Sequence, residues 1–70
     1  MEYIDVQDKL PTPGDLNTPG NKSNCYYLVI IEGYGPQLAM YLKDEYGKCD
    51  WYTNYVSKIF RNVTAYAKIQ

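Results

Sequence analysis

The sequence contains no histidine and only two cysteines, and its seven Lys and Arg residues nearly cancel its eight Asp and Glu residues. Without histidine, a Ser-His-Asp triad, a histidine general base and every histidine-containing zinc site are excluded. A net charge of −1 argues against binding to long nucleic acid, which requires many phosphate contacts. The longest uncharged apolar run, residues 26–31, is too short to span a bilayer. The composition therefore predicts a small protein that is not an enzyme, with no metal, no cofactor and no membrane or long nucleic-acid partner.

The length of 70 residues corresponds to one small domain, residues 1–70, with no internal boundary. A core of this size supplies about 3–5 kcal/mol, and small folds are commonly reinforced by disulfides, metals or a partner subunit. Cys25 and Cys49 can form at most one bridge, and no apolar signal-peptide segment precedes them. Two ordinary buried thiols in a reducing cytosol are therefore expected. Oligomerisation is the reinforcement that remains, so the sequence predicts a homo-oligomer.

Alternating and continuous apolar runs predict four or five short strands and no long helix. The strands are expected at residues 3–6, 26–31, 37–43, 49–54 and 63–69. Val56, Ile59 and Phe60 have i, i+3, i+4 spacing, which allows at most one short helical turn between residues 55 and 61. The expected fold class is all-β: a small, mainly antiparallel meander sheet.

Residues 11–24 read PTPGDLNTPGNKSN and follow the first expected strand. This density of Pro, Gly, Asn and Ser is typical of a loop. Such a loop is long for so small a domain. The composition favours a mobile connector, and the alternative is a segment recruited to a surface.

The strand expected at residues 26–31 is apolar on both of its faces. A strand in a single-layer sheet should be polar on the side that faces water. Either another part of the chain or another molecule must cover its second face, and we expect a second subunit to do so. The residues predicted to share this second face are Tyr27, Val29, Ile31, Ala39, Tyr41 and Tyr66.

Residues 3–11 read Y-I-D-V-Q-D-K-L-P, and residues 63–69 read V-T-A-Y-A-K-I. These segments resemble the two ends of a small phage and prophage protein family of unknown function. Members open with W-I-x-V-x-D-x-L-P and close with V-T-H-W-x-P-L-P. Residues 3–11 match the opening, with Tyr3 at the usual Trp, and residues 63–69 resemble the ending without its His and prolines. Residues 27–29 are similar to a V-L-V strand of the family, and residues 51–52 to its W-Y pair. The resemblance implies a phage origin and action in the host bacterial cytoplasm, and it supplies no catalytic residues.

The nine tyrosines exceed what a small core needs. Aromatic faces stack on nucleobases, and tyrosine is also favoured at protein interfaces, whereas packing on a sheet face is the alternative for each ring. The second half of the chain is basic, which suits one or two phosphates of a small nucleotide, although a solvated surface position is favoured for any one of these cations. The candidate ligand-binding residues are Tyr27, Tyr41 and Tyr66 as stacking surfaces and Arg61, Lys58 and Lys48 as phosphate partners.

Short phage accessory proteins without an enzyme signature often neutralise host defence. We therefore expect a counter-defence protein that sequesters a small nucleotide immune signal as a homo-oligomer. Two-fold symmetry suits a cyclic or pseudo-symmetric dinucleotide, because each half meets the same groups. The alternative is a protein–protein inhibitor that binds and blocks a host defence protein through the tyrosines or the 11–24 loop.

Overall fold

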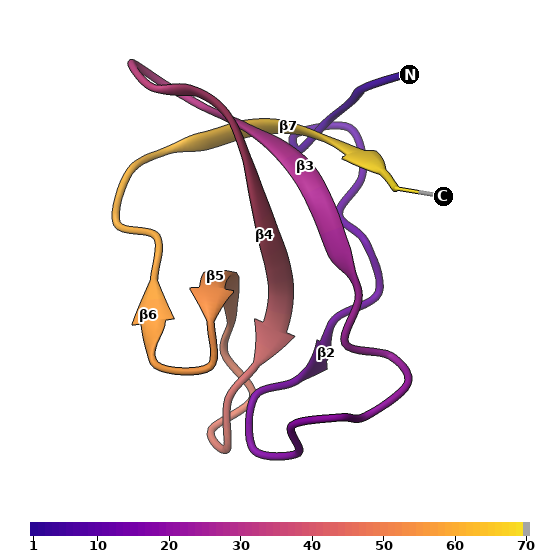
Figure 1. Ribbon diagram of the computed structural model, residues 1–70, viewed down its shortest axis with the longest axis vertical. Coiled ribbons are helices and arrows are strands. Elements are labelled where there is room, and N and C mark those ends of the chain that lie inside the picture. The colour runs from indigo at the N-terminus through magenta and orange to yellow at the C-terminus, as the bar shows by residue number, and fades with distance from the viewer. Residues whose placement is uncertain (70) are drawn as a thin grey trace.

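The computed structural model describes residues 1–69 and shows a small all-β fold (Figure 1). Its seven strands are β1 (Ile4–Asp5), β2 (Gly14–Asp15), β3 (Tyr26–Ile31), β4 (Gly35–Lys43), β5 (Cys49–Asn54), β6 (Ser57–Lys58) and β7 (Val63–Lys68). They form one open sheet in the order β1-β7-β3-β4-β5-β6, and β2 pairs in parallel with β4. The predicted all-β, mainly antiparallel sheet is confirmed. Nowhere in residues 1–69 is there a helix that could cross a membrane.

The connectivity departs from a simple meander at one end of the sheet, beside β3. Strands β3 to β6 follow one another as antiparallel neighbours, but β7 returns across the molecule to pair with β3, and β1 pairs with β7. The segment between residues 55 and 61, where the sequence allowed at most one short helical turn, contains no helix and forms β6, which pairs with β5. The side chain of Asn54 accepts a hydrogen bond from the Val56 N–H at 2.9 Å, which closes a tight hairpin instead. Val56 and Phe60 are consequently 92% and 88% exposed.

The sheet curls so strongly that rings from strands that are not neighbours meet. Trp51 on β5 and Tyr66 on β7 lie 5.7 Å apart between ring centroids, although β3 and β4 separate their strands in the sheet. The buried core cluster contains Val29, Ile31, Ala39, Trp51, Val63 and Tyr66, with Val6, Tyr27, Tyr41 and Ile59 packed against it. All six residues predicted to share the second face belong to this cluster. The curled chain itself covers this face, so its burial does not require a second subunit.

The 11–24 segment covers part of the opposite face of the sheet, so its interpretation as a mobile connector is also wrong. Strand β2 pairs with β4 just beyond the end of β3, with Gly14 opposite Leu42. A Cβ atom on Gly14 would collide with the side chain of Asn24 and press on Leu42. Leu42 and Met40, which share a face of β4, are both fully buried.

Side chains farther along that face are only partly buried. Tyr26 and Leu38 are exposed, and Leu28 and Ile30 are half-buried. We refer to these four residues as the outer apolar face. Cys25 precedes β3, at the point where the chain leaves the 11–24 segment. It is exposed, contrary to the expectation of a buried thiol.

Candidate ligand-binding grooves

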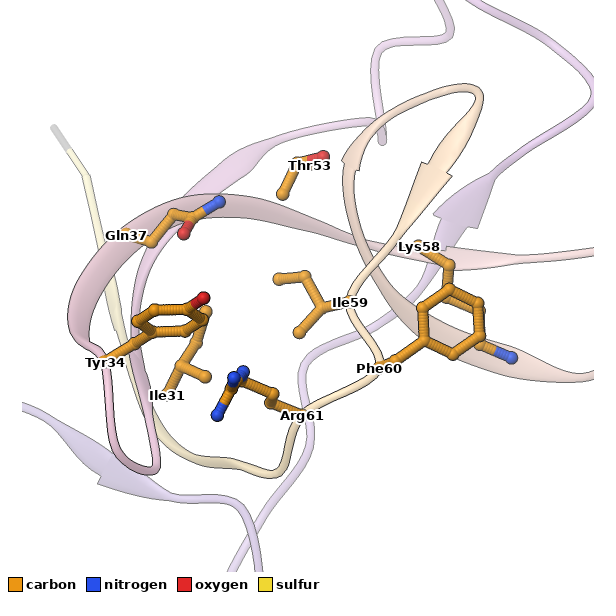
Figure 2. Close-up of a pocket in the computed structure, with 8 residues that line it drawn as sticks. All are labelled: Ile31, Tyr34, Gln37, Thr53, Lys58, Ile59, Phe60 and Arg61. Atoms are coloured by element: carbon orange, nitrogen blue, oxygen red, sulfur yellow. The ribbon is translucent and has the colours of Figure 1, made fainter.

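A groove of about 240 Å³, here groove 1, lies between the turn that joins β3 to β4 and the chain from β6 toward β7 (Figure 2). Ile31 and Ile59 supply its apolar surface, and Figure 2 shows Ile59 pointing into its middle. The Ile59 N–H donates to the Trp51 carbonyl at 2.8 Å, which holds this part of the chain against β5. Gln37 and Thr53 add an amide and a hydroxyl to the lining. The groove thus combines an apolar surface with a few hydrogen-bonding groups.

The aromatic side chain of Tyr34 projects from the turn because the backbone reverses sharply there. Gly33 and Gly35 adopt φ values of 82° and 89°, which favour glycine, and the Tyr34 N–H donates to the Ile31 carbonyl at 2.9 Å. The Tyr34 ring is 68% exposed, and the Arg61 guanidinium lies over it at 4.2 Å from the ring centroid. This cation–π contact fixes the plane of the guanidinium and leaves its N–H edge available to a phosphate.

The two cations at groove 1 differ in their electrostatic surroundings. Lys58 forms an ion pair with Asp50 at 3.2 Å, and its nitrogen lies 5.4 Å from the Phe60 ring centroid. Figure 2 shows this nitrogen on the far side of Phe60 from Tyr34. Within residues 1–69, no carboxylate lies within 4 Å of the Arg61 guanidinium. Arg61 is therefore the better candidate for binding an anion.

The three tyrosines predicted as stacking surfaces gather around Trp51, in the core rather than in groove 1. Tyr66 is only 4% exposed, and Tyr27 meets it edge-on at 5.5 Å between ring centroids. Tyr41 lies 4.8 Å from Trp51. Burial raises the pKa values of the Tyr27 and Tyr41 hydroxyls, so both remain protonated at neutral pH. These rings pack against Trp51, and Tyr27 also packs against Tyr66, so all three contribute to the core.

A second groove of about 310 Å³, here groove 2, lies between the N-terminal segment and β5. Tyr41 and Trp51 line it from the sheet, and Val6 and Leu10 line it from the N-terminal segment. Its remaining lining residues are Cys49, Asp50, Arg61, Asn62 and Val63. Groove 2 therefore contains the exposed part of the aromatic core.

The structure distributes the six predicted site residues among different places. Arg61 lines both grooves, Lys58 lines groove 1 and Tyr41 lines groove 2, whereas Tyr27, Tyr66 and Lys48 line neither. Lys48 lies exposed in the turn between β4 and β5, where its N–H donates to the side chain of Asp44.

Sequence reasoning missed six of the eight residues that line groove 1, which are Ile31, Tyr34, Gln37, Thr53, Ile59 and Phe60. The Gly-Tyr-Gly-Pro turn at residues 33–36 contained a usable signal, because a ring between two turn glycines has little chance of being packed. Phe60 was assigned to the face of a helical turn, and that assignment concealed its exposure. Gln37 and Thr53 carried no signal, since polar strand residues are common on any sheet.

The thiols and carboxylates of residues 1–69 do not gather into a group of three or more that could hold a metal ion. Cys25 and Cys49 are both free thiols. Comparisons of the chain with protein-family models, curated proteins and solved structures find no match.

Proposed function

We propose that this protein is a non-enzymatic binding protein that captures a small nucleotide in groove 1. The observation that carries the proposal is the Arg61 guanidinium, which is stacked on Tyr34 at 4.2 Å at the edge of an apolar groove. No carboxylate side chain is found among the groove-lining residues, so an anion meets little repulsion there. A planar guanidinium held by a ring is well suited to bidentate contact with a phosphate.

The other groups of groove 1 suit the base of such a ligand. A heterocycle placed over Ile59 would have the exposed Phe60 ring beside it. Base–aromatic stacking contributes about 1–3 kcal/mol per base. The Gln37 amide and the Thr53 hydroxyl line the same groove and can bond to the edge of the base. Binding of this kind requires an anionic group at Arg61 and a flat ring within reach of it.

The biological setting of the proposal comes from the resemblance to the phage and prophage family. A counter-defence protein in the host bacterial cytoplasm can act by capture alone, because a bound signal no longer reaches its receptor. A homo-oligomer would present several copies of groove 1. No bond in the ligand has to break, so the proposal assigns no catalytic residue.

The proposal is tested by thermal unfolding with a panel of linear and cyclic nucleotides. A ligand that binds only the folded state stabilises it by about 2.7 kcal/mol at a concentration 100 times its Kd, which raises the melting temperature. Arg61→Ala should weaken binding by about 10- to 100-fold, because a hydrogen bond to a charged group contributes about 1.5–3 kcal/mol.

The matched control is Lys48→Ala, since Lys48 is a cation that lines neither groove. Its affinity for nucleotides should equal that of the unmodified protein. Absence of any shift at millimolar nucleotide, or equal losses from Arg61→Ala and Lys48→Ala, would contradict nucleotide capture in groove 1.

The alternative function, a protein inhibitor of a host defence protein, is favoured by one specific observation. Val56 and Phe60 are the most exposed large hydrophobic residues of the described chain, and both belong to the segment that carries β6. Exposed apolar side chains next to cations are typical of protein interfaces. Val56 does not line groove 1, so Val56→Asp should abolish binding of a host protein and leave nucleotide binding unchanged.

A further inference from the structure

We infer that groove 1 and groove 2 are two subsites for a single dinucleotide, with one base in each groove and the linking phosphate at Arg61. The inference rests on the proposed function, because it assigns to groove 1 one half of the ligand. It goes beyond that function by giving groove 2 a role and by naming the size and chemistry of the ligand.

The first supporting observation is the position of Arg61 between the grooves. Arg61 lines both of them. The residues just before it, Ile59 and Phe60, line groove 1, and the residues just after it, Asn62 and Val63, line groove 2. A phosphate bound by Arg61 would therefore lie beside a residue that borders both grooves. Groups attached to its two sides would reach one groove each.

The second observation is that both grooves offer the same kinds of chemical groups. Groove 1 has an aromatic ring and a carboxamide in Tyr34 and Gln37, and groove 2 has them in Tyr41 and Asn62. A carboxamide can donate and accept hydrogen bonds at the edge of a base, and a ring can contact its face. The grooves are thus chemically suited to two similar halves of one molecule.

The third observation is size. Sites for drug-sized ligands usually enclose about 300–1,000 Å³. Groove 1, at about 240 Å³, is smaller than this range, and groove 2, at about 310 Å³, lies at its lower end. The combined volume of the two grooves falls well within this range. A ligand that fills both gains contacts that neither groove provides alone.

Groove 2 also contains Asp50, a carboxylate that could repel a phosphate. Its Oδ2 atom pairs with Lys58 at 3.2 Å, and its Oδ1 atom accepts a hydrogen bond from the Trp51 N–H at 2.8 Å. Both carboxylate oxygens are therefore engaged, and the charge of Asp50 is balanced by a neighbouring cation. The Arg61 guanidinium has no such partner within residues 1–69, so it dominates the field felt by the linking phosphate.

The test compares adenosine monophosphate with 5′-phosphorylated diadenylate, using calorimetry and tryptophan fluorescence. Trp51 is the single tryptophan and lines groove 2, so its emission reports directly on that groove. The dinucleotide should bind at least tenfold more tightly than the mononucleotide, because joining two weakly bound groups makes the second contact intramolecular. It should also change Trp51 emission more than the mononucleotide does.

Variants separate the two subsites. Asn62→Ala should lower the affinity for the dinucleotide by about two- to tenfold, the usual effect of one lost hydrogen bond. It should leave the affinity for the mononucleotide unchanged. Asn17→Ala, on the exposed 11–24 segment, is the matched control and should change neither affinity. A mononucleotide that binds through Arg61 as tightly as the dinucleotide, with no greater change of Trp51 emission for the latter, would overturn the two-subsite inference and keep the proposed function. If neither probe binds at millimolar concentration, the two-subsite inference and the proposed function are both overturned.

Discussion

At the scale of single residues, Asn24 links the 11–24 segment to the rest of the fold. Its side-chain oxygen accepts a hydrogen bond from the Asp15 N–H at 2.6 Å, and its amide nitrogen donates to the carbonyls of Asp15 and Thr18. The same nitrogen lies 3.0 Å from the Tyr55 hydroxyl, which belongs to the β5–β6 hairpin. One amide thus satisfies several polar groups in a segment whose composition suggested mobility.

We expect Asn24→Ala to lower the free energy of unfolding by about 1–3 kcal/mol, because part-buried backbone groups lose their partner. Urea unfolding followed by Trp51 emission measures the change. Asn17→Ala removes a side-chain amide from the same segment and should change the free energy of unfolding by no more than about 0.5 kcal/mol. Equal losses in the two variants would show that Asn24 has no special role.

The candidate site shows what residue types alone can indicate. Arg61 was selected from the sequence because guanidinium groups bind phosphates, and it lines both grooves. The sequence does not predict Tyr34 as a site residue, because its role at the site depends on the cation–π contact with Arg61, a residue far away in the sequence. Pairing between distant residues depends on how the sheet curls, and the alternation of side chains does not contain that information.

At the scale of elements, β4 is the central strand, with β5 on one side and both β3 and β2 on the other. Its side chains are buried on both faces: Ala39 belongs to the aromatic core, and Met40 and Leu42 are buried on the side of the 11–24 segment. Leu38, farther from that segment, remains exposed. The stability of the fold should therefore respond very differently to substitutions only two residues apart.

Met40→Ala is expected to lower the free energy of unfolding by about 2–5 kcal/mol, the usual cost of truncating a fully buried side chain. Leu38→Ala on the same strand face should cost less than about 1 kcal/mol, because solvent already reaches this side chain. Chemical unfolding of the two variants provides the comparison. A similar loss for both would mean that the 11–24 segment does not seal Met40.

Alternation along the strands predicted correctly which residues share a face, including Tyr27 on β3 and Tyr41 on β4. The helical spacing of Val56, Ile59 and Phe60 does not correspond to a helix, because these residues follow a tight hairpin closed by Asn54. A spacing rule treats these side chains as one buried face. In the structure Ile59 packs against the core, whereas Val56 and Phe60 face solvent.

At the scale of the whole molecule, the curled sheet changes the argument for assembly. The aromatic face that was expected to need a second subunit forms the interior of a single chain. The outer apolar face remains open to solvent at Tyr26 and Leu38. The predicted homo-oligomer therefore requires a different surface, and the outer apolar face, which contains no charged residue, is suited to it.

We expect size-exclusion chromatography with light scattering to give a mass above that of the 8.1 kDa monomer at micromolar concentration. Leu38→Lys should shift the protein to the monomer, because a lysine in an apolar interface would be buried without a partner. A monomer before any substitution would contradict self-association. An oligomer that Leu38→Lys leaves intact would show that its interface lies elsewhere on the molecule.

The pairing of β1 with β7 joins the beginning of the described chain to its end. Ile4 lies opposite Tyr66, and the Val6 N–H donates to the Thr64 carbonyl at 3.0 Å. Strand β1 is the edge strand of the sheet, directly beside β7. Val6 and Leu10, close to this junction, form one wall of groove 2. Groove 2 is consequently complete only after synthesis and folding have brought the two ends together. A ligand bound there would contact both ends and stabilise their pairing.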